Sequence, residues 1–266
     1  MISFLSIIAV GFFLGMRHAT DADHVIAVTT IVSRQRNLLK AALTGVFWGI
    51  GHTFTILVVG TAIILFDVVI PARIGLSMEF SVGLMLIALG GMNIANFMRA
   101  ARAISPLPEG SDLVHSHPHI HGDYTHNHTH GHEETHSHSH QTSLTWLDRV
   151  FGKIGLYQQL RPLVVGIVHG LAGSAAVALL ILTTIRNPHW AIVYLLVFGA
   201  GTVGGMMLIT MSIASAFKFF GQKNERFSHW LGFASGLLSL AFGFFLAYQI
   251  GFANGLFSGH PQWTPR

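Results

Sequence analysis

The sequence predicts an all-α fold, a polytopic membrane helical bundle of six transmembrane helices. Hydrophobic residues make up 51% of the 266 residues and charged residues only 10%, whereas about a quarter of a soluble domain is charged. The charges lie mostly between long apolar runs, and each run supplies the ~20 residues that a membrane helix needs. Short basic loops between six such runs disfavour the alternative of a large soluble core. A membrane β-barrel needs strict apolar–polar alternation over about ten residues, which the sequence lacks.

The spans are expected near residues 2–32, 41–66, 76–98, 162–185, 190–217 and 229–252. The first is not a signal peptide, because no basic region precedes the apolar run and Arg17 follows it. As one straight helix, residues 2–32 would extend about 46 Å, well beyond a hydrocarbon core of ~30 Å. This length favours a break near His18–Asp21.

Lysine and arginine are concentrated in alternate loops. They follow the first, third and fifth spans, at Arg34, Arg36, Lys40, Arg99, Arg102, Arg149, Lys153, Arg161, Lys218, Lys223 and Arg226. The opposite side carries Arg73, Arg186 and Arg266. The positive-inside rule therefore places the richer side in the cytoplasm and both termini outside, in a plasma membrane. Because topology explains these basic residues, no nucleic acid is expected as a partner.

The two halves of the chain share landmarks at a nearly constant offset. His18 matches His169, and the following glycine pairs match: Gly49 and Gly51 with Gly199 and Gly201, and Gly83 and Gly90 with Gly236 and Gly243. Three spans per half would make the copies enter the membrane from opposite sides, as in the inverted repeats of secondary transporters. Chance similarity of glycine-rich helices is the alternative. We expect one three-helix repeat in 1–105, a loop in 106–145 and a second repeat in 146–266.

The segment Arg17–Val25, RHATDADHV, places charged groups and histidines inside the first span. A charge at membrane depth costs at least a few kcal/mol, so it persists only if it pairs, faces water or holds an ion. We predict a cation site of five residues: His18, Asp21, Asp23, His24 and, from the second span, His52. On an unbroken helix Asp23 would point away from the others. Either Asp21 is then the ligand and Asp23 supports it, or a break lets the side chains converge.

Imidazole and carboxylate without sulfur suit Ni²⁺, Co²⁺, Zn²⁺ or Cu²⁺ better than Mg²⁺ or Ca²⁺, and the chain has no cysteine. No prosthetic group is expected. Simpler roles stay open for some residues: His52 or His169 could only donate a hydrogen bond to a carbonyl, and for His169 the two roles are equally supported. Arg17 could neutralise an aspartate or reach the outer surface. Asn93 and Asn96 are interpreted as interhelical hydrogen-bonding residues.

The predicted loop is rich in histidine, at positions 115, 117, 119, 121, 126, 128, 130, 132, 136, 138 and 140. Its alternating pattern offers no face that could pack, so we expect disorder in the absence of metal. Neutral imidazoles at this density bind Ni²⁺, Co²⁺ or Zn²⁺, more weakly as the pH falls towards 6. The loop is therefore either a cytoplasmic metal buffer or a polar linker.

The segment from Arg17 to His24 resembles the signature of the nickel–cobalt transporter family, and Gly51-His52-Thr53 resembles that family's next motif. The resemblance implies a plasma-membrane permease with His18, Asp23, His24 and His52 in the metal path. The second half carries no acidic motif at His169-Gly170-Leu171, which is similar to the shorter six-span members, some linked to nickel supply and others to efflux.

These observations predict a secondary transporter, not an enzyme, that moves Ni²⁺ or Co²⁺ through the lipid bilayer. No nucleotide-binding P-loop is present, and an inward membrane potential favours uptake. Efflux driven by a counter-ion is the alternative. A membrane metalloenzyme with histidine boxes is a weaker alternative, because the sequence has a single compact histidine motif. A metal sensor is another weak alternative, because nothing in the sequence resembles an output domain. A homo-oligomer is left open.

Overall fold

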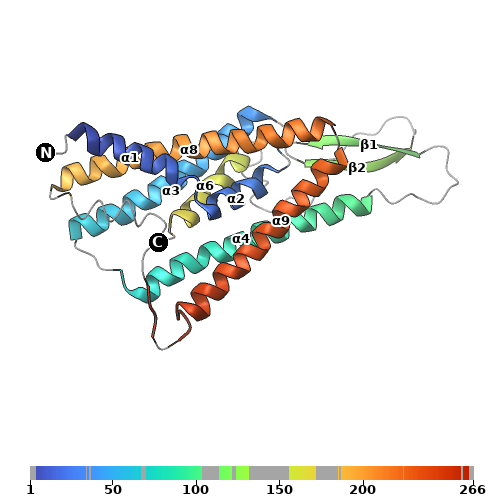
Figure 1. The fold of residues 1–266 in the computed structure, drawn as a ribbon. Helices are drawn as coiled ribbons and strands as arrows, with labels where there is room; N and C mark the ends of the chain where they lie inside the picture. Colours follow the sequence, from blue (N-terminus) through green and yellow to red (C-terminus); the bar gives the residue numbers. More distant parts are fainter. Residues whose placement is uncertain are drawn as a thin grey trace.

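The computed structural model describes residues 4–33, 35, 37–66, 70–103, 114–121, 124–131, 156–171, 185, 187–223, 225–258 and 260–263. Most of this part is an elongated bundle of helices (Figure 1). The helices are α1 (Phe4–His18), α2 (Ala22–Val32), α3 (Leu38–Phe66), α4 (Ala72–Ala103), α6 (Leu156–Gly170), α8 (Pro188–Lys223), α9 (Glu225–Tyr248) and the π-helical turn η3 (Gln249–Ala253).

Four helices in this part of the chain are long and apolar enough to cross a membrane. They cover Leu38–Phe66, Ala72–Arg99, Pro188–Gly221 and His229–Ala253. The first expected span is instead two shorter helices, and the fourth, 162–185, is described only at residues 162–171 and 185. The prediction of a helical membrane bundle is therefore confirmed, whereas the count of six spans stays a prediction.

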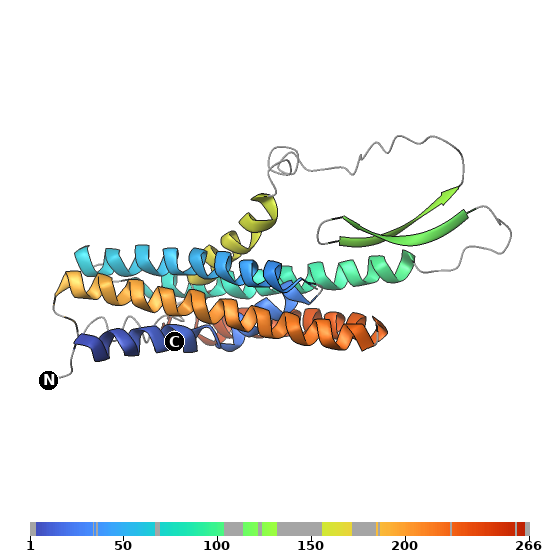
Figure 2. The ribbon, with the colours of Figure 1, turned by 90° about the horizontal axis from the view of Figure 1, so that it is seen from above.

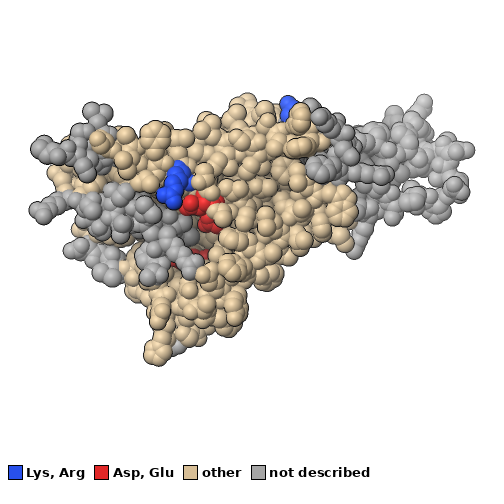
Figure 3. All heavy atoms as spheres, viewed as in Figure 1, with Lys and Arg blue, Asp and Glu red and all other residues tan. Residues whose placement is uncertain are grey.

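The surface of the bundle suits lipid. Large apolar side chains such as Phe13, Phe66 and Phe245 are more than half exposed. Lysine, arginine, aspartate and glutamate occupy only small areas of the face drawn in Figure 3. Such an apolar exterior would be a liability in water and is what a bilayer requires.

The helices form a row with a second pair beside it. In the row, α1 contacts α8, α8 contacts α3 and α3 contacts α6, while α4 and α9 form the pair. The short helix α2 contacts α4, α8 and α9, so it lies between the row and the pair. The interior is mostly apolar around Trp48, Leu86 and Met206.

A break separates α1 from α2. Helix α1 ends at His18, Ala19 and Thr20 form a turn, and Asp21 has an extended ψ of 146° before α2 begins at Ala22. The turn is closed by hydrogen bonds from the Thr20 amide to Arg17 O (2.8 Å) and from the Asp21 amide to His18 O (3.1 Å). The structure thus has the break that the length of the first span favours. Side chains on its two sides no longer follow one helical period.

Glycines bring the helices of the row into backbone contact. A β-carbon at any of four glycines would collide with a carbonyl oxygen of the neighbouring helix: Gly15 with Phe198, Gly201 with Phe12, Gly51 with Leu163 and Gly166 with Trp48. Only glycine leaves room for these approaches, as at other close crossings of membrane helices. The crossings hold the end of α1 and the end of α6 against α8 and α3.

Polar contacts connect α4, α9 and α2. The buried amide of Asn93 donates to Gly232 O at 3.0 Å and to Ser235 Oγ at 3.3 Å. Thr30 in α2 donates to Ser235 O at 3.2 Å. Asn93 therefore has the interhelical role that the sequence suggests.

An antiparallel hairpin, β1 (Val114–His121) with β2 (Tyr124–Gly131), lies within the segment expected to be disordered. It differs from that expectation because the alternating sequence has the two-residue period of a strand; the rest of the segment lies outside the described residues. Figure 2 shows the hairpin beyond one end of the bundle and the N-terminus at the other.

Candidate metal centre

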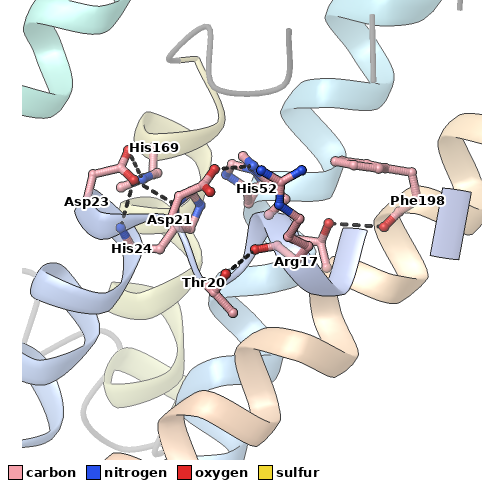
Figure 4. A network of polar contacts seen from close by, with 10 residues as sticks. Arg17, Thr20, Asp21, Asp23, His24, His52, His169 and Phe198 are labelled. Atoms are coloured by element: carbon pink, nitrogen blue, oxygen red, sulfur yellow. Dashed lines mark hydrogen bonds and ion pairs between the residues drawn. The ribbon is translucent and has the colours of Figure 1, made fainter. Parts of the chain in front are cut away.

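Four buried histidines from four helices converge in the middle of the bundle. His18 ends α1, His24 lies in the first turn of α2, His52 in the middle of α3 and His169 in the last turn of α6. Their exposed fractions are 6%, 0%, 1% and 0%. The ring centre of His24 lies 4.7 Å from that of His18, 5.0 Å from His52 and 4.1 Å from His169. His24 is therefore the centre of the group (Figure 4).

Two aspartates contact these rings, at different depths. Asp23 Oδ1 lies 3.1 Å from His24 Nδ1, and Asp23 Oδ2 lies 3.1 Å from His169 Nε2. Asp21 Oδ2 lies 2.8 Å from His18 Nδ1. The side chain of Asp23 is 18% exposed and that of Asp21 is 41% exposed. Asp23 thus joins two imidazoles inside the group, and Asp21 lies at its rim.

Three buried histidine nitrogens of the cluster have no hydrogen-bond partner among the residues that the structure describes: His24 Nε2, His52 Nδ1 and His169 Nδ1. A buried polar atom without a partner costs roughly 1–3 kcal/mol. In addition, His18 Nε2 and His52 Nε2 lie 2.9 Å apart, a spacing at which two neutral rings can share only one hydrogen. A cation that accepts lone pairs would satisfy several of these atoms together.

The ligand atoms form two sets that share one residue. The first is His18, His24 and His52, and the second is Asp23, His24 and His169; within each set all ligand atoms lie within 4.8 Å of one another. Atoms that bind one first-row ion at ~2.1 Å are ~3–4 Å apart. A small closure of either set would therefore complete a site with the nitrogen and oxygen donors that nickel, cobalt, zinc and copper accept.

The surroundings of the cluster are apolar. The ring of Phe198 lies 5.6 Å from that of His18, and the ring of Trp48 lies 5.6 Å from that of His169. The glycine crossings described above place the backbone of a neighbouring helix directly beside Phe198 and Trp48. Few other polar groups can screen charge here, so an ion and the carboxylate of Asp23 would interact more strongly than in water.

All five residues predicted from the sequence lie in this cluster, and the helix break brings them together. Asp21 belongs to neither ligand set, and its contact with the cluster is the one with His18. The exposed Arg17 lies beside it (Figure 4). His169 is the residue that the sequence left undecided, and its match to His18 in the other half of the chain is the signal that points to it.

The apolar helices and their interior cluster of imidazoles and carboxylates define a multi-pass membrane protein with a candidate metal centre. No family model matches the chain, and no solved structure matches it. The chain is 34% identical over 256 residues to the urease accessory protein UreH of Bacillus sp. (strain TB-90), a match that covers 96% of each protein. The chain therefore belongs to the UreH family.

Proposed function

We propose that this protein is a secondary transporter that carries Ni²⁺, and also Co²⁺, across the plasma membrane. The observation that carries the proposal is the buried cluster, in which nitrogen and oxygen donors from four helices meet at His24. The name of the UreH relative adds support, since urease is a nickel enzyme and an accessory membrane protein could supply that metal. Cobalt is included because the same donors accept both ions.

The ion is bound by stepwise replacement of its water. Asp21, which is partly exposed, meets the ion first and passes it to His18, which it contacts at 2.8 Å. His18, His24 and His52 then replace water with imidazole nitrogens, and the carboxylate of Asp23 offsets part of the positive charge. A divalent ion without these groups could not enter an apolar interior, because a single unpaired charge is already costly there.

Reciprocal glycine contacts support the proposed inverted repeats. If His18 corresponds to His169, the contact of Gly15 with Phe198 O in α1 and α8 corresponds to the contact of Gly166 with Trp48 O in α6 and α3. Three further pairs of contacts correspond in the same way. The contact of Gly201 with Phe12 corresponds to that of Gly51 with Leu163, and the contact of Gly49 with Val203 corresponds to that of Gly199 with Thr53. The contact of Gly90 with Gly236 likewise corresponds to that of Gly83 with Gly243. Movement of one repeat against the other would expose the cluster to the two sides in turn.

We also propose that the hairpin end of the bundle is cytoplasmic and that the ion moves inwards. In Figure 2, α3 begins and α8 ends towards the hairpin, so the basic residues near these helix ends share one side. The positive-inside rule places that side in the cytoplasm. An inward potential favours entry of a divalent ion by about 4.6 kcal/mol per 100 mV, so uptake needs no counter-ion.

The direct test is ⁶³Ni²⁺ flux into proteoliposomes in which the orientation of the protein is known. We expect nickel to accumulate when the potential draws cations inwards through the correctly oriented protein, and unlabelled Co²⁺ to compete. The His52→Gln variant should lose the flux, whereas His189→Gln should keep it, because His189 is exposed at the start of α8. Absence of nickel flux under every potential and proton gradient would refute the transporter, and normal flux in His52→Gln would refute the site.

A further inference from the structure

We propose that the cluster contains two adjacent ion positions that share His24, and that His169 is a metal ligand of the second one. The first position is His18, His24 and His52, and the second is Asp23, His24 and His169. This inference rests on the proposed transport of a divalent ion and specifies how that ion crosses the centre of the protein.

The ring of His24 has one nitrogen available for each position. Its Nδ1 lies 3.1 Å from Asp23 Oδ1, which assigns that nitrogen to the second position. Its Nε2 has no partner among the described residues, and its ring lies 4.7 Å from that of His18 and 5.0 Å from that of His52. One imidazole can therefore hold an ion on either side in turn.

His169 does not have the hydrogen bonding of a purely structural histidine. Its Nε2 lies 3.1 Å from Asp23 Oδ2, while its Nδ1 is buried without a partner in the described part of the chain. A neutral imidazole has one N–H and one lone pair. Whichever nitrogen carries the hydrogen, one buried group is therefore unsatisfied, and binding of a cation removes that defect.

The repeat places His169 where His18 lies in the other half. Gly15, three residues before His18, contacts Phe198 O, and Gly166, three residues before His169, contacts Trp48 O. Each histidine thus lies in the last turn of a short helix, just beyond the same kind of crossing. If His18 binds the ion in the first half of the protein, the equivalent position of His169 makes it a metal ligand in the second half.

The two positions differ in charge. The residue that corresponds to His52 in the second half is Thr202, whose buried hydroxyl donates to Phe198 O at 3.0 Å. The second position has the carboxylate of Asp23 in place of a third imidazole. An ion would thus pass from three neutral nitrogens to a set with a negative charge, while the hydrogen of the His24 ring moves from Nδ1 to Nε2.

The two positions share the ring of His24. A neutral imidazole has one lone pair, so this ring can bind an ion in only one of the positions at a time. We therefore expect one ion per cluster, in the wild-type protein and in any variant that keeps either position.

The test is nickel binding to the purified full-length protein in detergent, with ⁶³Ni²⁺ flux measured separately. Glutamine replaces His52, His169 or His24 in turn, since its amide nitrogen can keep the hydrogen bond that His169 Nε2 makes to Asp23. His189→Gln is the matched control. The histidines of the loop are the same in every protein, so the binding that remains in His24→Gln is subtracted as their contribution.

We expect His52→Gln and His169→Gln each to keep one nickel ion in the cluster and to lose transport, whereas the double variant keeps none. Nickel X-ray absorption should show a mixed nitrogen and oxygen shell in His52→Gln and an imidazole-rich shell in His169→Gln. Wild-type transport in His169→Gln would overturn the proposal, because hydrogen bonding to Asp23 would then be that residue's whole role. Loss of all cluster binding in both His52→Gln and His169→Gln would also overturn it, in favour of one undivided site. A lack of flux in the wild type would refute transport alone, since binding is measured independently.

Discussion

Replacement of Asp23 by asparagine tests the electrostatic basis of the cluster. Asp23 is the only acidic residue in either ligand set found among the described residues, and its two oxygens contact His24 and His169 at 3.1 Å. The substitution keeps the size of the side chain and one acceptor oxygen, but it removes the negative charge. We expect it to abolish nickel transport and to weaken nickel binding.

The size of the effect follows from Coulomb's law. The ligand atoms of each set lie within 4.8 Å of one another, so a bound ion is no more than about 4 Å from the carboxylate. A divalent ion and one negative charge at ~4 Å attract each other by about 8 kcal/mol at an effective dielectric constant of 20. Even a quarter of this energy, about 2 kcal/mol, would weaken binding about 30-fold.

The assay is nickel affinity by titration calorimetry in detergent, with ⁶³Ni²⁺ flux measured in parallel. Asp21→Asn is the matched control, because Asp21 carries the same charge, contacts only His18 among the cluster residues and has a side chain that is 41% exposed. Solvent screens such a group, so we expect a much smaller loss of affinity. Wild-type affinity in Asp23→Asn would refute the reasoning, and so would an equal loss in the two variants.

Three further outcomes are expected. Gly166→Ala should destabilise the protein by about 1–3 kcal/mol through overpacking and lower its unfolding temperature in detergent, because the new β-carbon would collide with Trp48 O. Gly204→Ala is the control and should leave the unfolding temperature unchanged, because nothing lies within 4 Å of a β-carbon there. Equal effects of the two substitutions would contradict the proposed crossing. Deletion of 112–140 should change the apparent affinity or pH dependence of nickel uptake but leave flux, and complete loss of flux in a well-inserted protein would show that the loop is part of the path. Asn93→Ala should destabilise the bundle by about 1 kcal/mol, measured by thermal unfolding, because the buried amide links α4 to α9; an unchanged unfolding temperature would count against that link.

The sequence predicts the four long apolar helices because hydropathy and length are local properties. The break at Ala19–Asp21 also follows from length alone, since the first apolar segment is too long for one helix in a bilayer. The sequence does not predict in which direction the side chain of Asp23 points after the break. A period of 100° per residue holds only within one helix, so the direction of Asp23 depends on backbone angles at the turn.

His169 is harder to assign because its partners are distant in sequence. It meets Asp23 across 146 residues, and no periodic pattern reports such a contact. Its correspondence with His18 is informative only if the two halves are true repeats. The hairpin shows a different limit, since alternation such as His115-Ser116-His117 offers no face that could pack, although the same two-residue period suits a strand.

The central claim is that imidazole and carboxylate groups inside the membrane are tolerated because they bind a divalent ion. X-ray absorption at the nickel edge of the protein without residues 112–140 tests it most directly, because the histidines of the hairpin are then absent. The account predicts one nickel ion with imidazole nitrogen and carboxylate oxygen ligands, lost in His24→Gln. A well-folded protein that binds no nickel, or whose nickel shell is unchanged in His24→Gln, would contradict it.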